Sequence, residues 1–140
     1  MPFHEMMVAP IRQELTRHGV RELRTPEEVD HVLGPRAGTA VLAVNSVCGC
    51  AAGRMRPAFV IALRNERLPA AVATVFAGQD LEATARAREY LAPYPPSSPS
   101  LFLLRDGEVV FALERKDIEH RAPEDIAMDL RAAFDRFCAG

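Results

Sequence analysis

Two cysteines that flank a single glycine, Cys48 and Cys50, are the side chains of this chain best suited to chemistry. They follow an apolar run over residues 39–45 and precede a helix-like segment that begins near Cys50. Gly49 can adopt whatever φ a tight connection needs. Two thiols at the junction of a strand and a helix fit either a redox centre or part of a metal site.

The expected position of Cys48, just before the first turn of a helix, favours its thiolate. Free backbone N–H groups and the positive end of the helix dipole stabilise negative charge there. Arg54 and Arg56 follow closely in the sequence and are expected to add positive potential. Because these effects lower the pKa of a cysteine, we predict that Cys48 is the attacking thiolate. Cys50, within the turn and less exposed, is then the resolving thiol.

A disulfide between Cys48 and Cys50 would close a smaller ring than one between cysteines separated by two residues. The smaller ring makes favourable disulfide dihedral angles harder to reach. A strained disulfide is a better oxidant and is easily reduced. The spacing therefore predicts thiol–disulfide exchange of an oxidising or monothiol type.

The alternative is a metal- or cluster-binding carrier that uses the same two cysteines. A structural zinc ion takes four ligands, so further donors would be needed. The remaining candidates are scattered and show no ligand spacing: Cys138, His4, His18, His31 and His120. The carrier would have to bind its metal across a subunit interface. We therefore favour the redox interpretation, with no metal and no bound cofactor, and expect Cys138 to be buried as a small hydrophobic residue.

The composition is that of one ordinary globular domain. The chain has 140 residues, of which 49% are hydrophobic, with a net charge of −2. That charge argues against a general nucleic-acid or membrane-surface binder, and no apolar run is long enough to span a bilayer. The start of the chain lacks the pattern of a secretory signal, and three cysteines do not make a disulfide framework. We therefore expect a single cytoplasmic domain over residues 1–140, without nucleic-acid or membrane partners; the sequence carries no signal for an oligomeric state.

Hydrophobic periodicity predicts alternating helices and strands, and hence a central mixed sheet flanked by helices after a helical N-terminal extension. The predicted elements are a helix opened by Pro10 and stopped by Gly19, a helix from Pro26 with a capping box at Thr25, a strand over 39–45, a helix over about 50–64 kinked at Pro57, a strand over 70–76, a helix capped by Asp80, a hairpin of strands 101–104 and 109–113, and a helix from Pro123.

A proline-rich loop, residues 93–100, precedes the strand predicted at 101–104. In the thioredoxin fold a cis-proline precedes an antiparallel strand and lies beside the active-site cysteines. The whole order of elements resembles that fold, and a Ser-Pro bond is cis at modest cost. We therefore expect Pro99, after Ser98, to be cis and to lie opposite Cys48 and Cys50.

At a finer level the chain closely resembles the bacilliredoxin family of thioredoxin-like proteins. The string around the cysteines is long and specific, and the matching stretches cover nearly the whole chain. These stretches are 23–30, 44–53 followed by Arg56 and Pro57, 94–100, 106–108, Glu114 and Arg115 with 117–119, and 133–135 with Cys138.

The resemblance implies an enzyme that removes bacillithiol from proteins carrying it as a mixed disulfide. Cys48 would attack the bacillithiol sulfur, and Cys50 or a second bacillithiol would resolve the adduct. Bacillithiol is then a co-substrate and S-bacillithiolated client proteins are the partners. We expect Arg54 or Arg56 to pair with its malate carboxylates, Ser98 and Ser100 to offer hydrogen bonds to the docked thiol, and Pro99 to lie beside it. The alternatives are that both arginines are solvated on the helix surface and that the two serines cap the turn. General disulfide isomerisation would use the same residues and stays open as an alternative.

Overall fold

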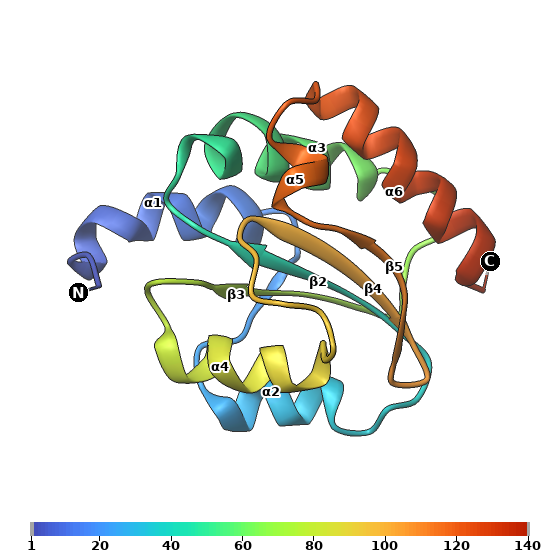
Figure 1. The fold of residues 1–140 in the computed structure, drawn as a ribbon, viewed down its shortest axis with the longest axis horizontal. Coiled ribbons are helices and arrows are strands. Elements are labelled where there is room, and N and C mark those ends of the chain that lie inside the picture. The colour runs from blue at the N-terminus through green and yellow to red at the C-terminus, as the bar shows by residue number, and fades with distance from the viewer. Residues whose placement is uncertain (1, 140) are drawn as a thin grey trace.

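The computed structural model describes residues 2–139 and shows an α/β fold of five strands and their flanking helices (Figure 1). The elements are α1 (Glu5–Thr16), β1 (Arg21–Glu22), α2 (Pro26–Leu33), β2 (Thr39–Asn45), a π-helical turn η1 (Ala51–Met55), α3 (Arg56–Ala62), β3 (Ala71–Phe76), α4 (Leu81–Tyr90), β4 (Ser100–Arg105), β5 (Glu108–Leu113), α5 (Arg115–Ile118) and α6 (Pro123–Phe137). The short elements β1 and α5 were not predicted from the sequence.

The sheet is mixed, with the strand order β1-β3-β2-β4-β5. Strand β2 pairs in parallel with β3 and antiparallel with β4. Helices α1, α3 and α6 lie on one side of the sheet, and α2 and α4 on the other (Figure 1). This arrangement confirms the predicted thioredoxin-like architecture with a helical N-terminal extension.

Side chains alternate along β2 and supply two separate cores. Val41 and Ala43 pack in the core beneath α3 and α6, whereas Leu42 and Val44 pack in the core above α2 and α4. All four are fully buried, because a central strand that is covered by helices on both faces of the sheet has no solvent-exposed face. We call these the α3/α6 core and the α2/α4 core.

Helix α1 is fixed to the sheet by one buried guanidinium. Arg12, 5% exposed, donates to Glu5 at 2.7 Å, to Glu22 of β1 at 2.7 Å and to both carboxylate oxygens of Asp80 at 2.7 and 2.9 Å. It also lies over the Phe76 ring, 5.2 Å from its centroid. The network joins α1, β1 and the start of α4.

The starts of two helices, α4 and α1, differ from those predicted from the sequence. Asp80 does precede α4, but its side chain makes no capping hydrogen bond, because its carboxylate is bound by Arg12. Helix α1 begins at Glu5 rather than at Pro10, because the His4 ring accepts a hydrogen bond from the Met6 N–H. The capping box at the start of α2 is present as predicted.

The helix after β2 is not simply kinked at Pro57; a π-helical turn precedes the proline. Residues 51–55 form a π-helical turn, with the Arg56 N–H bonded to the Ala51 carbonyl, and α3 starts at Arg56. Pro57 has no N–H to donate to the Gly53 carbonyl, and its ring would crowd that carbonyl in a regular α-helix. The wider π turn relieves both problems.

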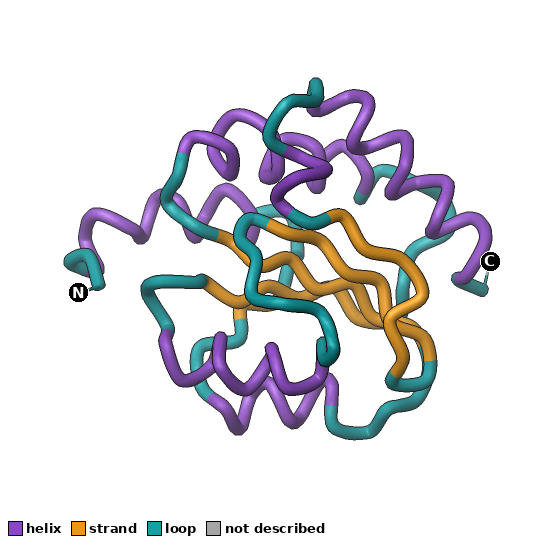
Figure 2. Tube along the Cα trace, viewed as in Figure 1, coloured by secondary structure: helices purple, strands orange, loops and turns teal. Residues whose placement is uncertain are grey.

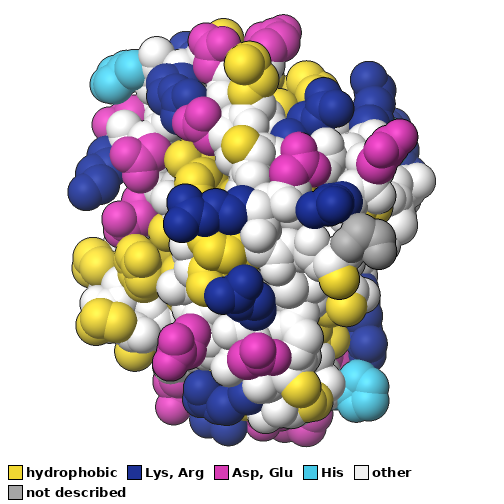
Figure 3. All heavy atoms as spheres, turned by 90° about the vertical axis from the view of Figure 1, so that its right-hand side faces the viewer, with side chains coloured by type: hydrophobic (Ala, Val, Ile, Leu, Met, Phe, Trp, Pro, Cys, Tyr) yellow, Lys and Arg dark blue, Asp and Glu magenta, His cyan; other side chains and the backbone are white. Residues whose placement is uncertain are grey.

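The loop that joins α4 to β4 runs up from the α2/α4 layer to the edge where β4 begins (Figure 2). At the opposite end of β4 the predicted hairpin is present, with Asp106 at φ 51° and Gly107 at φ 85°. On the face that includes this hairpin turn, acidic and basic side chains are interspersed (Figure 3). Between residues 2 and 139 we find no helix with the length and hydropathy needed to cross a bilayer.

Replacing Arg12 by Met should destabilise the protein by about 3 kcal/mol, because it leaves the Asp80 and Glu22 carboxylates without their buried partner. Arg86→Met is the matched control, since Arg86 also binds an aspartate, Asp30, and lies over a tyrosine ring, but is half-exposed. Its loss should change stability little. Urea unfolding measures both; equal effects of the two substitutions would contradict the role assigned to Arg12.

Candidate active site

Cys48 follows the end of β2 and lies at the N-terminal end of a helical turn. The Cys48 carbonyl accepts hydrogen bonds from the Ala51 and Ala52 N–H groups, both at 3.1 Å. Cys48 therefore precedes the first turn, as the sequence predicts. It packs against the edge of the α3/α6 core. Cys48 and Cys50 are both half-buried free thiols, so the expected difference in exposure between them is not found.

The environment of Cys48 favours its thiolate. Burial by itself raises the pKa of Cys48, but four other contributions outweigh it, and the net pKa is lowered. The largest is the Ser46 hydroxyl, whose Oγ lies 3.0 Å from Sγ. The backbone N–H groups of Ala51 and Cys50 and the positive charge of Arg115 lower it further. These are the hydrogen bonds and charges that activate a cysteine as a nucleophile.

Arg115 is the cation that reaches the cysteines. Its Nη2 lies 3.9 Å from the Cys50 Sγ, and its Nη1 donates to the Ser98 carbonyl at 3.2 Å. Its backbone N–H donates to the Ser97 hydroxyl at 2.9 Å, and its Nε to Glu119 at 3.2 Å. Arg115 therefore links the proline loop to the thiols, while about half of its side chain stays in solvent.

The loop before β4 lies beside the cysteine loop. Val44 of β2 pairs with Ser100 of β4, so the residues just before Ser100 run alongside those just after Val44. The Ser98–Pro99 bond is cis, and Pro99 is buried. Ser100 is fully buried and donates to the Ser97 carbonyl at 2.6 Å, which braces the loop internally.

The two arginines expected to add positive potential at Cys48 form hydrogen bonds with other groups instead. Arg56 is only 3% exposed, and its guanidinium binds Glu14, Asn45 and the Ser46 carbonyl. Arg54 donates to the Arg121 carbonyl at 2.6 Å. Neither is among the groups that shift the pKa of Cys48, and the buried Arg56 guanidinium is already occupied by its own partners. Arg56 faces inward because the π turn and the start of α3 direct its side chain into the protein.

Sequence reasoning missed Ser46 and Arg115. Ser46 lies two residues from Cys48 within the string that resembles the bacilliredoxins, so its proximity was the available signal. Arg115 is 65 residues from Cys50, and no local spacing relates the two. Only its place in another matching stretch, beside Glu114, pointed to it.

Within residues 2–139, Cys138 and the histidines considered as metal ligands form no cluster with Cys48 and Cys50. Cys138 is 5% exposed at the end of α6, within the α3/α6 core, and burial raises the pKa of its thiol. It is therefore the small buried residue that was predicted. Across residues 2–139, no three His, Cys, Asp or Glu side chains gather in a way that could hold a metal ion.

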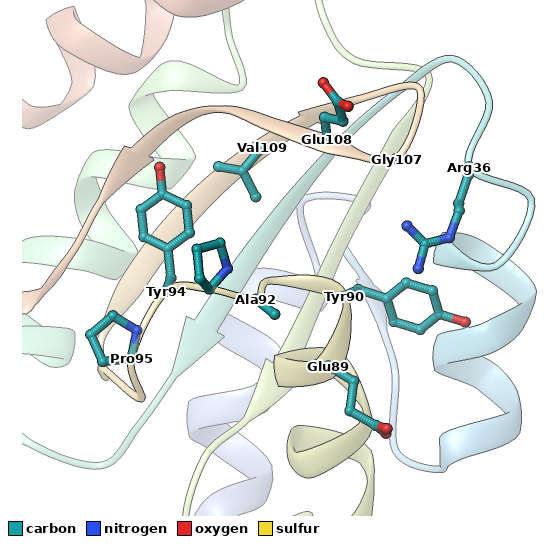
Figure 4. Close-up of a pocket in the computed structure, with 10 residues that line it drawn as sticks. Arg36, Glu89, Tyr90, Ala92, Tyr94, Pro95, Gly107, Glu108 and Val109 are labelled. Atoms are coloured by element: carbon teal, nitrogen blue, oxygen red, sulfur yellow. The ribbon is translucent and has the colours of Figure 1, made fainter.

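A cavity of about 620 Å³ lies between the end of α4, the start of the proline loop and the β4–β5 turn (Figure 4). Tyr90, Tyr94 and Val109 line it, and all three pack on the α2/α4 core. Cys48 packs on the other core, across the sheet. The cavity is therefore separate from the thiols.

Cys48 should be alkylated by iodoacetamide with a pH midpoint below that of an ordinary cysteine, because only the thiolate reacts. The rate should rise with pH and level off above the lowered pKa. Ser46→Ala removes the largest favourable contribution and should move the midpoint upwards. Peptide mass spectrometry resolves the sites, with buried Cys138 as the unreactive internal control. An unchanged midpoint in Ser46→Ala would contradict the assigned hydrogen bond.

Comparison with known proteins agrees with this geometry. A protein-family model described as disulphide isomerase matches residues 3–138. A bacilliredoxin of Geobacillus kaustophilus is 53% identical over 97% of this chain and 94% of its own, and one of Salinibacter ruber is 54% identical over 99% and 82%. The thioredoxin of Fasciola hepatica superimposes with a TM-score of 0.57 at 18% identity, over 84% of this chain and 99% of its own, and so shares the fold. The chain therefore belongs to the bacilliredoxin family and is a thiol–disulfide oxidoreductase.

Proposed function

We propose that this oxidoreductase removes bacillithiol from proteins that carry it as a mixed disulfide, using Cys48 and Cys50. The observation that supports this most is the activated Cys48 thiol, whose sulfur lies 3.0 Å from the Ser46 hydroxyl oxygen, with a second thiol two residues away. The identity of about half to proteins named bacilliredoxin, over nearly the full chain, supports the choice of thiol. We place the reaction in the cytoplasm, where thiols are kept reduced.

The proposed reaction exchanges one disulfide for another. The Cys48 thiolate attacks the bacillithiol sulfur of the modified protein, an S–S bond forms between them, and the protein leaves as its thiolate. Cys50 then attacks Cys48, releases bacillithiol and forms the Cys48–Cys50 disulfide, which an external dithiol or two thiols must reduce. In the alternative resolution a second bacillithiol attacks the adduct and leaves as bacillithiol disulfide, which frees Cys48.

Arg115 can act on both thiols of this exchange, the Cys48 thiolate and the bound bacillithiol. Its positive charge favours the thiolate form of Cys48, and half of its side chain faces solvent. We propose that it, rather than Arg54 or Arg56, pairs with a carboxylate of bacillithiol. Ser98 and Pro99 form the adjoining wall against which the docked thiol would lie.

Cys48→Ser should abolish release of bacillithiol from a modified client, because it removes the thiol that attacks the mixed disulfide. Cys50→Ser should still attack, and in the absence of free bacillithiol it should accumulate a one-to-one adduct on Cys48. Intact-protein mass spectrometry detects the adduct and the released client thiol. Undiminished release by Cys48→Ser would overturn the proposal.

Arg115→Gln should slow release of bacillithiol about tenfold, because it loses both the charge beside the thiolate and the group for the carboxylate. Lys116→Gln is the matched control: it removes the same charge from the same short helix, and the Lys116 side chain is exposed and does not reach the cysteines. The ratio of the two rates is the measurement. Equal rates for Arg115→Gln and Lys116→Gln would contradict the role proposed for Arg115 in the exchange.

Isomerisation of protein disulfides is a second candidate, favoured by the description of the matching family model. It also begins with attack by Cys48 but acts on disulfides within one polypeptide. Refolding of a protein with scrambled disulfides, measured beside bacillithiol release, separates the two. A much greater rate of refolding than of release would favour the isomerase.

A further inference from the structure

Arg56 is a buried cation that the proposed exchange does not use. It lies at the start of α3, directly after the π turn, with 3% of its surface exposed. Its Nη1 donates to the Asn45 side-chain oxygen at 2.9 Å and to the Ser46 carbonyl at 2.8 Å. Its Nε donates to Glu14 of α1 at 3.0 Å. A guanidinium in this setting fixes its neighbours in place, because its donors form a planar fork.

The two residues that Arg56 holds are those that lead into the cysteine loop. The Asn45 side-chain oxygen, held by Arg56, in turn accepts a hydrogen bond from the Ser46 N–H at 2.9 Å. Both backbone polar groups of Ser46 are therefore fixed through Arg56, one directly and one through Asn45. The one remaining polar group of Ser46 is its hydroxyl, which lies 3.0 Å from the Cys48 sulfur.

We propose that Arg56 is a positioning residue for the thiol chemistry, because it holds Ser46 where the Ser46 hydroxyl can donate to the Cys48 thiolate. The Arg56 guanidinium does not touch the sulfur, and of its three hydrogen-bonded partners, Glu14, Asn45 and Ser46, only Ser46 does. Its own partner Glu14 anchors it from α1, so the N-terminal helix supports the active site through this one side chain. The positioning role holds for any thiol partner and does not depend on bacillithiol.

Removal of Arg56 would also affect Cys48 if the side chain acted in either of two simpler ways. The first is direct attraction between its charge and the thiolate across the protein. The second is a general contribution to the stability of the fold. A positioning role differs from both, because it acts only while the Ser46 hydroxyl is present. A double-mutant cycle between Arg56 and Ser46 therefore separates positioning from attraction and from stability.

The test is the pH profile of Cys48 alkylation by iodoacetamide in the reduced full chain, followed by peptide mass spectrometry. Arg56→Gln and Arg56→Lys should each slow alkylation near neutral pH about five- to tenfold, and Ser46→Ala should slow it to a similar extent. In the Ser46→Ala background neither substitution should slow it further. Arg56→Lys keeps the charge and is the milder change, so it reports on position even where Arg56→Gln fails to fold.

Arg64→Gln is the matched control for charge. Arg64 lines the same surface hollow as Arg56 and Glu14 but donates no hydrogen bond to Asn45 or Ser46. It should leave the profile unchanged. An equal slowing by Arg56→Gln with and without the Ser46 hydroxyl, or an unchanged profile in both Arg56 variants, would overturn the inference. Because the reagent is iodoacetamide, either result leaves the proposed release of bacillithiol to be judged by its own assay.

Discussion

Strand β2 is hydrogen-bonded along both edges, to β3 in parallel and to β4 in the antiparallel direction, and the active site depends on this pairing. The parallel neighbour requires the chain to leave β2 through a helix, which places Cys48 before a helical turn. The antiparallel neighbour brings the start of β4, and with it Pro99, back to the end of β2. One register, Val44 opposite Ser100, thus brings two loops together that are far apart in the sequence.

Around the sulfur, the balance is between burial and hydrogen bonding. Half-burial of Cys48 against the α3/α6 core opposes ionisation, whereas Ser46, two backbone N–H groups and Arg115 favour it. The favourable contributions come from the loop around Cys48 and from Arg115, which is distant in the sequence, so the lowered pKa is a property of the assembled fold. Two arginines away from the sulfur also hold separate parts of the chain together. Arg12 connects α1 to the sheet, and Arg56 connects α1 to the loop that follows β2.

The expectations for the arginines and for Asp80 show where sequence reasoning stops. Closeness along the chain placed Arg54 and Arg56 beside Cys48, yet a helix directs successive side chains to different sides. Arg56 faces inward and Arg54 binds the Arg121 carbonyl. Asp80 lies at the position of a helix cap, but the buried Arg12 guanidinium binds both oxygens of its carboxylate, and such a bidentate ion pair is favoured over a capping bond to a backbone N–H.

The sequence by itself determined the family, the order of helices and strands, the attacking and resolving cysteines as a hypothesis, and the burial of Cys138. These follow from local periodicity, from turn and capping residues and from a long string around Cys48. Only the tertiary structure decided that Arg115, 65 residues from Cys50, is the cation at the thiols and that Arg56 is a buried support. The reason is physical: local patterns report which face of an element is apolar, whereas the partner of a charged side chain depends on which elements meet across the fold.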